Sequence, residues 1–310
     1  MLAYLAGRLG WAAVVMLVVS VLAFGLYALA PGDPARLLLS ASGMNPVPEE
    51  AVVAKRAEMG LDDPLVVRYL SWLRGAVQGD LGRSFRSYQP VTGLYLERLP
   101  ATILLATLAT LLSCIVAVPL GTLAAYQRGG PLDTLAQLIA ALGVALPSFW
   151  VALIAMFVFA ATLQWLPAFG SLTPQGIVMP AGVLALANLA VLTRLTRATV
   201  LDVLGQEYVT VARAKGLRTT AIARRHVLPN VIVPILTVLG LELAHALTGA
   251  IVIEYIFAWP GVGKLAVDAA LLGDVPIVIG CATLAGLAFV IVNLTVDIGA
   301  AALDPRVRRA

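Results

Sequence analysis

One run of the sequence, residues 134–193, contains no Asp, Glu, Lys, Arg or His over 60 consecutive positions. A membrane-spanning helix needs about 20 predominantly apolar residues, so this run is too long for a single crossing. Polar and turn-forming residues at 164–167 and 171–176 predict that it divides into two helices. Across the chain 12% of residues are charged, against about 25% in soluble domains. This composition excludes a disordered, collagenous or disulfide-stapled chain.

Four further apolar runs are long enough to cross a membrane. They lie at residues 9–30, 99–127, 227–253 and 275–296. Together with the two halves of 134–193, they predict an all-α polytopic membrane protein with six transmembrane helices in a lipid bilayer. The first run could instead be a signal peptide, because Ala28-Leu29-Ala30 fits a small-x-small cleavage site. Its apolar core is longer than that of a typical signal, so we expect it to be retained.

The positions of the basic residues predict the orientation, because cytoplasmic loops carry an excess of Lys and Arg. Twelve basic residues fall on one side of the predicted helices: Arg8, Arg128, Arg194, Arg197, Arg213, Lys215, Arg218, Arg224, Arg225, Arg306, Arg308 and Arg309. We therefore expect both termini in the cytoplasm. The formal net charge of +4 follows from the same bias, and no nucleic-acid partner is expected.

This topology divides the chain into parts. They are the cytoplasmic N-terminus with the first helix (1–30), an extracytoplasmic loop (31–98), a core of five helices (99–303) with a cytoplasmic loop (194–226), and a cytoplasmic tail (304–310).

The extracytoplasmic loop is predicted to contain two short helices. One starts near Glu49 and is stopped by Gly60. The other follows Asp62-Asp63-Pro64, which resembles an N-cap with proline in the first helical turn. The loop is either a small cap packed on the ends of the helices or a docking surface for a delivery protein, and the sequence leaves both interpretations open.

No catalytic motif is present. The string Gly261-Val262-Gly263-Lys264-Leu265 lacks the earlier glycine and the Ser or Thr that a phosphate-binding loop needs. HExxH, GxSxG and CxxC patterns are absent, and Cys114 and Cys281 each lie inside an apolar run. The sequence therefore predicts a non-catalytic membrane protein with no cofactor bound to this chain.

The cytoplasmic loop carries the most informative pattern. Val209, Ala212 and Leu217 lie near one face of a predicted helix that Gly216 would end. Such an amphipathic helix suits a groove in a partner protein. A solvated basic loop that merely satisfies the orientation rule is the alternative.

The loop resembles the "EAA" loop of ABC-importer permeases through Ala212, Gly216, Leu228 and Pro229. Thr210 and Val211 replace the Glu and first Ala of the general pattern. This departure is similar to the dipeptide/oligopeptide/nickel branch, whose form Tyr-Val-x-x-Ala-Arg-Ala-Lys-Gly-Leu is matched by residues 208–217. Further segments that resemble the family occur in its order at 31–34, 60–65, 79–84, 147–150, 194–197, 254–263 and 303–306.

The resemblance implies a type I ABC-importer permease bundle in a bacterial or archaeal cytoplasmic membrane. A homologous second permease would complete a heterodimer, two ATPase subunits would bind ATP and Mg²⁺, and an extracytoplasmic binding protein would deliver the cargo. Coupling to the ATPases would run through the 207–229 loop. The implied coupling residues are Glu207, Tyr208, Ala212, Arg213, Lys215, Gly216, Leu217, Leu228 and Pro229.

The cargo implied by the family is short peptides or nickel chelates. In the membrane, Glu242 and His245 are three residues apart on one helix face. They are candidates for the translocation path because buried ionisable groups are costly. Metal contact, lining of a wet cavity and plain helix packing all stay open for this pair.

A stand-alone secondary transporter is the alternative function. It would carry inverted repeats with broken helices, and no such internal repeat is visible. A channel would need a filter segment, and none stands out.

Overall fold

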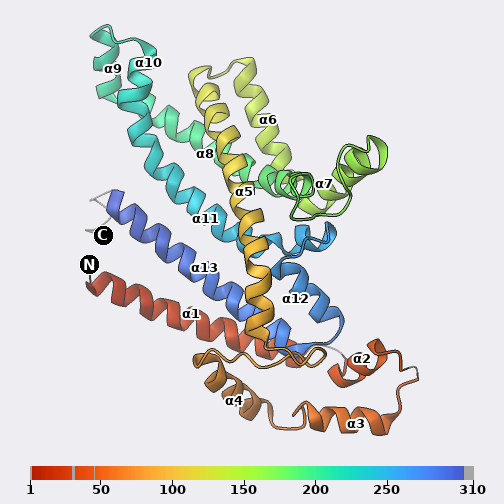
Figure 1. Ribbon diagram of the computed structural model, residues 1–310. Coiled ribbons are helices and arrows are strands. Elements are labelled where there is room, and N and C mark those ends of the chain that lie inside the picture. Colours follow the sequence, from red (N-terminus) through yellow and green to blue (C-terminus); the bar gives the residue numbers. More distant parts are fainter. Residues whose placement is uncertain (1, 30–31, 45, 304–310) are drawn as a thin grey trace. The chain divides into compact units, whose positions relative to one another are not determined.

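The computed structural model describes residues 2–29, 32–44 and 46–303, and throughout these ranges the chain is helical apart from turns, loops and an isolated bridge between Arg83 and Pro90 (Figure 1). The predicted tail at 304–310 lies outside the described residues. The chain forms two compact units, one of residues 1–103 and 258–290 and the other of residues 104–257 and 291–310.

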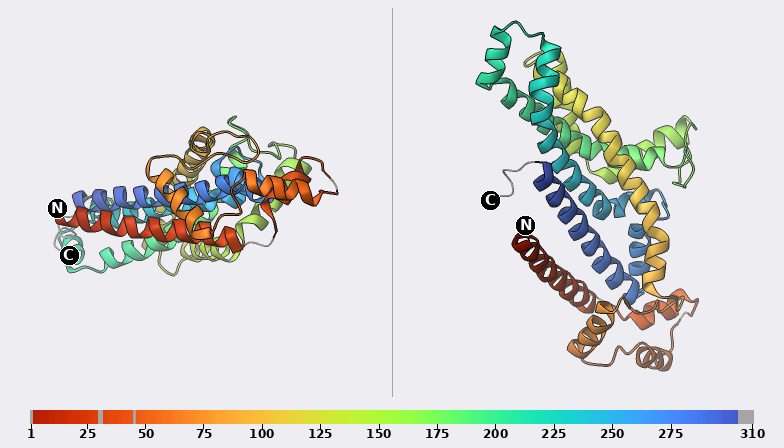
Figure 2. Two further views of the ribbon diagram at one scale, coloured as in Figure 1. Left: turned by 90° about the horizontal axis from the view of Figure 1, so that it is seen from below. Right: turned by 60° about the vertical axis from the view of Figure 1, so that its left-hand side comes forward.

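The first unit contains short helices, the long helix α1 and the first parts of two other long helices. They are α1 (Leu2–Leu29), α2 (Pro34–Ala41), α3 (Glu49–Glu58), α4 (Leu65–Val77), the start of α5 (Val91–Tyr126), α12 (Val262–Leu271) and the start of α13 (Val275–Leu303). In this unit α1 runs alongside α13 (Figure 2). A Cβ atom added to Gly286 of α13 would come within 3.1 Å of Val19 Cγ1 of α1, so glycine allows the close approach.

The second unit holds the remaining helices and the rest of α5 and α13. They are α6 (Pro131–Ala145), α7 (Ser148–Ala155), the π-helix η1 (Met156–Thr162), α8 (Val178–Leu204), α9 (Glu207–Ala214), α10 (Thr219–Ile222), the π-helix η2 (Ala223–Val227) and α11 (Leu228–Ile256).

The apolar helices agree with the predicted spans in place but not in every boundary. Among the described residues, four are long and apolar enough to cross a membrane: Val91–Tyr126, Val178–Leu204, Thr219–Leu247 and Val275–Val296. The pair α6 and α7–η1 makes a fifth if it is one broken span, and α1 contains the shorter apolar stretch Gly10–Gly25. The number six therefore stays a prediction. Helix α5 begins at Val91, so its first turns lie within the segment predicted as loop.

The third predicted span is not one helix, contrary to expectation. It bends by 102° between Ala145 and Ser148. Leu146 is extended, with ψ of 123°, and Pro147 precedes the next helix. The residue before proline is pushed out of the helical region by the proline ring, which explains the break at this position.

The loop helices form where the sequence predicts them, but the second begins differently. Helix α3 begins at Glu49 and precedes Gly60 as expected. Helix α4 begins at Leu65, with Pro64 as its N-cap and no side-chain cap, so the prediction that an aspartate caps a helix containing Pro64 is wrong. Arg56 of α3 donates to Asp33, the N-cap of α2, over 2.9 Å. Burial raises the pKa of Asp33, but hydrogen bonds from Arg56 and Ala35 outweigh it and leave that pKa below its usual value.

A buried carboxylate fixes the segment before α5 in the first unit. Asp274 is 2% exposed and accepts from Ser84 Oγ at 2.5 Å and from Phe85 N at 3.1 Å. Ser84 is equally buried and its Oγ accepts from the backbone N–H of Ser87 at 2.9 Å. Ser84, the last residue of the segment 79–84 that resembles the family, therefore has a structural role within this unit.

The motif at 254–263 also has a structural role in the first unit. The Trp259 side chain is fully buried and its Nε1 donates to Ala101 O over 3.0 Å. Val262 N donates to Thr102 Oγ1 over 2.9 Å. Ala258 has φ of 51°, a left-handed conformation that is uncommon for residues other than glycine. These bonds tie the turn before α12 to α5.

Candidate functional site

Helix α9 is the centre of the candidate coupling site. It follows α8 after Gly205 and Gln206, and the chain then passes through α10 and η2 into α11. Figure 1 shows α9 and α10 together, at the point where α8 ends and α11 begins. Pro229 lies in the first turn of α11, directly after the π-helix η2.

The end of α9 is a Schellman motif built on glycine. Gly216 has φ of +77°. Its N–H donates to Arg213 O over 2.9 Å, and Leu217 N donates to Ala212 O over 3.2 Å. These two bonds satisfy carbonyl groups that the helix end leaves open. The prediction that Gly216 ends the helix is confirmed.

This conformation gives a test of the local structure. A Cβ at Gly216 meets nothing within 4 Å, so a substitution there acts through backbone strain of about 1–2 kcal/mol. We expect Gly216→Val to reduce copurification of ATPase subunits strongly and Gly216→Asn to reduce it little, because Asn tolerates the left-handed region and β-branched valine does not. Gly205→Ala is the control, since Gly205 has negative φ and its added Cβ meets only ordinary contacts at 3.6 Å. Equal behaviour of the Val and Asn variants would contradict the proposed role of the turn.

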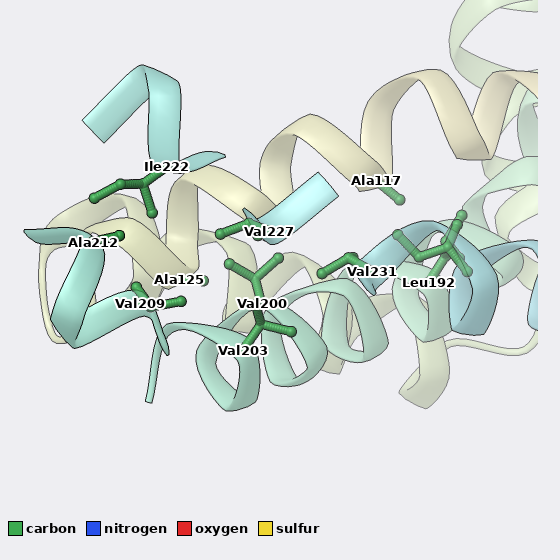
Figure 3. Packing of buried hydrophobic residues seen from close by; sticks show 11 residues of the cluster. Ala117, Ala125, Leu192, Val200, Val203, Val209, Ala212, Ile222, Val227 and Val231 are labelled. Atoms are coloured by element: carbon green, nitrogen blue, oxygen red, sulfur yellow. The ribbon is translucent and has the colours of Figure 1, made fainter. Parts of the chain in front are cut away.

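One face of α9 is anchored inside the chain. Val209 and Ala212 are 0% and 5% exposed. They belong to an apolar cluster, drawn in Figure 3, whose buried members come from five neighbouring elements. These members are Ala117 and Ala125 of α5, Leu192, Val200 and Val203 of α8, Ile222 of α10, Val227 of η2, and Val231 and Ile235 of α11. Leu217 packs against the same cluster. The apolar face that the sequence offered to a partner groove is therefore covered by the chain's own helices.

The opposite face of α9 is open. Tyr208 and Val211 are 43% and 51% exposed. The Tyr208 ring lies 6.1 Å from the ring of His226, which is partly buried in η2. The predicted coupling residues thus separate into two groups. Ala212 and Leu217 pack inward around Gly216, whereas Glu207, Tyr208, Arg213, Lys215, Leu228 and Pro229 are exposed.

Beside this cluster lies a buried ion pair that sequence reasoning missed. Asp133, in the first turn of α6, has a side chain only 3% exposed. Arg197 of α8 donates to it through Nη2 at 2.8 Å and also through Nε. Asp133 further accepts from Gly129 N at 2.9 Å and from Gln137 Nε2 at 3.0 Å. A fork-shaped guanidinium suits both carboxylate oxygens at once, which makes this pair strong and directional. An aspartate two residues after Gly129-Gly130-Pro131 was the available signal.

Close backbone packing accompanies the ion pair. A Cβ at Gly121 of α5 would lie 2.7 Å from Thr193 O and 2.8 Å from Thr196 Cβ of α8. Only glycine permits this approach. A Cβ at Gly143 of α6 would likewise lie 2.8 Å from Ala190 Cβ. Helix α8, which leads into α9, is thus held by both α5 and α6.

Glu242 and His245 both lie on α11, as predicted. Glu242 is partly buried and His245 is exposed in this chain. Within the described residues, no group of three or more His, Cys, Asp or Glu side chains is arranged to hold a metal ion. The pair therefore lacks a third protein ligand from the described part of the chain.

Comparison with known families identifies the architecture. Residues 117–309 match the family described as binding-protein-dependent transport system inner membrane component, and residues 1–106 match its N-terminal family. The chain belongs to this family. It is a multi-pass inner-membrane protein, and its predicted all-α fold and permease membership are confirmed.

Relatives of the permease extend over its whole length. A Brucella abortus (strain 2308) protein described as a peptide transport system permease is 42% identical over 316 aligned positions, covering 99% of each chain. The oligopeptide transport system permease protein AppB of Bacillus subtilis (strain 168) is 36% identical and the glutathione transport system permease protein GsiC of Escherichia coli O6:H1 is 35% identical, each again covering 99% of both chains.

The fold is shared with a solved structure. An inward-facing structure of the MetNI methionine ABC transporter superposes with a TM-score of 0.55 at 15% identity, covering 68% of this permease and 96% of that chain. A second crystal form gives a TM-score of 0.57 at 12% identity. The predicted type I ABC-importer permease bundle is confirmed by this match.

Proposed function

We propose that the chain is the membrane-spanning permease subunit of an ATP-driven importer of short peptides, with both termini in the cytoplasm. The observation that carries this function is the two-sided helix α9. Its inner face belongs to an apolar cluster shared with α5, α8, α10 and α11, and its outer face is open. A force applied to the open face is therefore transmitted to three long helices through close-packed contacts.

The partners follow from this arrangement. Two ATPase subunits would bind α9 and the matching helix of a second, homologous permease, and ATP with Mg²⁺ would be held by those subunits. Their closure would bias the helix bundle between inward- and outward-facing states. An extracytoplasmic binding protein would release cargo onto the outer loops. This chain contributes no bond-making chemistry.

Peptides are the cargo that the observations favour. The relatives above are named for peptides, oligopeptides and glutathione. Nickel chelates have less support, because none of the relatives described above is named for nickel. A stand-alone secondary transporter is not supported by any of these relatives.

The function is tested by uptake into proteoliposomes containing this permease, the second permease and the ATPases, supplied with binding protein. We expect ATP-dependent accumulation of labelled di- and tripeptides and no accumulation by this chain alone. ATP-dependent uptake of nickel in place of peptides would replace the cargo assignment. Uptake by the isolated chain without ATPases would contradict the importer assignment.

A second prediction concerns Glu242, which we propose lines the path and meets the amino group of the peptide. A hydrogen bond to a charged group contributes about 1.5–3 kcal/mol. Glu242→Gln should therefore lower the maximal uptake rate at saturating loaded binding protein by about tenfold or more. His245→Ala should have a smaller effect. Leu236→Met, at an exposed position of the same helix, is the control for assembly. Unchanged rates for all peptides in both variants would remove the pair from the path.

A further inference from the structure

An open cavity lies in the second unit where η1 ends, and it belongs to none of the sites above. Its volume is about 580 Å³, within the range of small-ligand pockets, roughly 300–1,000 Å³. Ten residues line it: Met156, Phe157, Ala160, Ala161, Gln164, Trp165, Leu166, Pro167, Ala168 and Gln175. With both termini in the cytoplasm, this segment between the third and fourth predicted spans faces the side on which cargo arrives.

Irregular backbone shapes one wall of the cavity. The π-helix η1 widens the end of the helix, and the Thr162 hydroxyl donates to Phe157 O over 3.0 Å. The chain then folds back, and Trp165 N donates to Phe159 O over 2.9 Å. Gln164 makes this reversal with φ of 54°. π-Helical turns and strained residues of this kind concentrate at functional sites.

The other wall is held by a tight turn. Gly176 approaches Ser171 so closely that a Cβ would lie 2.6 Å from Ser171 N. Gly170 N donates to Phe257 O at 2.5 Å, which ties the loop to the end of α11. Gln175 is therefore presented by a fixed turn.

The lining has a distinctive chemistry. None of the ten residues is ionisable, and most are apolar or aromatic. Phe157 and Trp165 are each 68% exposed, leaving a large apolar surface uncovered. Gln164 and Gln175 are exposed, and within the described residues their side-chain amides bond no other group, so each offers donors and an acceptor to an occupant.

These features select among occupants. A lipid acyl chain would cover the aromatic surface but leave both amides unsatisfied, at a cost of about 1–3 kcal/mol per polar group. A phosphate headgroup or the charged end of a peptide would find no counter-charge in the lining. An internal peptide segment supplies an apolar side chain together with backbone N–H and C=O groups for the amides.

We propose that this cavity receives one apolar side chain of the cargo peptide, with Gln164 and Gln175 bonding the adjacent peptide units. The assignment rests on the proposed function and adds a side-chain preference to it. The permease itself, and not only the binding protein, then discriminates among peptides.

The test compares Ala-Phe-Ala with Ala-Ala-Ala in the fully reconstituted importer, at saturating loaded binding protein so that delivery is equal. Ala161→Leu adds three carbon atoms to the lining. We expect the ratio of maximal uptake rates, Ala-Phe-Ala over Ala-Ala-Ala, to fall about tenfold, the scale on which filling an apolar pocket discriminates substrates. Leu172→Phe also adds three carbon atoms, at an exposed position of the same loop outside the lining, and should leave the ratio unchanged. Gln175→Leu should lower uptake of both peptides.

An unchanged ratio in Ala161→Leu, or the same fall in Leu172→Phe, would overturn the cavity assignment while leaving peptide import intact. A ratio that follows the acyl-chain composition of the vesicles in place of the Ala161 substitution would assign the cavity to lipid. Failure of the wild-type importer to accumulate either peptide would overturn the proposed function, and the cavity assignment with it.

Discussion

Val211→Asp should abolish association of the ATPase subunits while the chain still inserts and folds. Val211 is 51% exposed on the open face of α9, so the change disturbs no internal packing. In a complex, it would place an unpaired charge in a desolvated contact, which is strongly unfavourable. We expect the affinity of the ATPases to fall by at least about 100-fold, equivalent to about 2.7 kcal/mol. Copurification from detergent and cargo-stimulated ATP hydrolysis measure the effect.

The matched control is Val77→Asp. Val77 is 82% exposed at the end of α4 in the first unit, so the same chemical change is made far along the chain from α9. We expect normal ATPase copurification in this variant. Full association in Val211→Asp, or equal loss in both variants, would show that the open face of α9 is not the contact.

Arg197→Met should destabilise the assembled permease. The Asp133 carboxylate would keep its place in a buried site but lose its counter-charge, and removing one partner of a buried pair is far more damaging than removing both. We expect the thermal unfolding midpoint of the purified complex to fall by about 5–10 °C, and ATPase coupling to weaken because α8 leads directly into α9.

The double variant Asp133→Leu with Arg197→Met separates charge from packing. It removes both charges, so part of the midpoint should be recovered relative to Arg197→Met alone. Recovery should be incomplete, because Gly129 N and Gln137 also lose the Asp133 carboxylate as acceptor. A midpoint within about 2 °C of wild type in Arg197→Met would contradict a structural role for the pair.

The coupling loop shows how far sequence reasoning reaches. The end of α9 was predictable because glycine at a helix terminus is a local signal, readable from a few residues. The identity of the partner-facing surface was not. Val209 and Val211 have the same side chain two positions apart, yet one is fully buried and the other half exposed. Only the positions of α5, α8 and α11 decide between them.

The candidate sites beyond the loop divide in the same way. The break at Pro147 has a local cause and could have been predicted. It was missed because the spans were assigned from the length of the charge-free run alone. The pairing of Asp133 with Arg197 joins residues 64 positions apart, and in the sequence Arg197 counts only as one of the basic residues that predict the orientation. The cavity at Ala161 depends on a π-helix and a chain reversal that no periodic pattern encodes.

Hydrophobicity, charge bias and family motifs in the sequence by themselves determined that this chain is an all-α membrane permease, because a bilayer demands long apolar helices whatever their neighbours. Tertiary structure decided which face of α9 is anchored and which is open, which charges are paired, and where an uncharged cavity forms. These properties arise from contacts between helices distant in sequence, since packing at near-crystalline density selects partners by shape and not by local residue type.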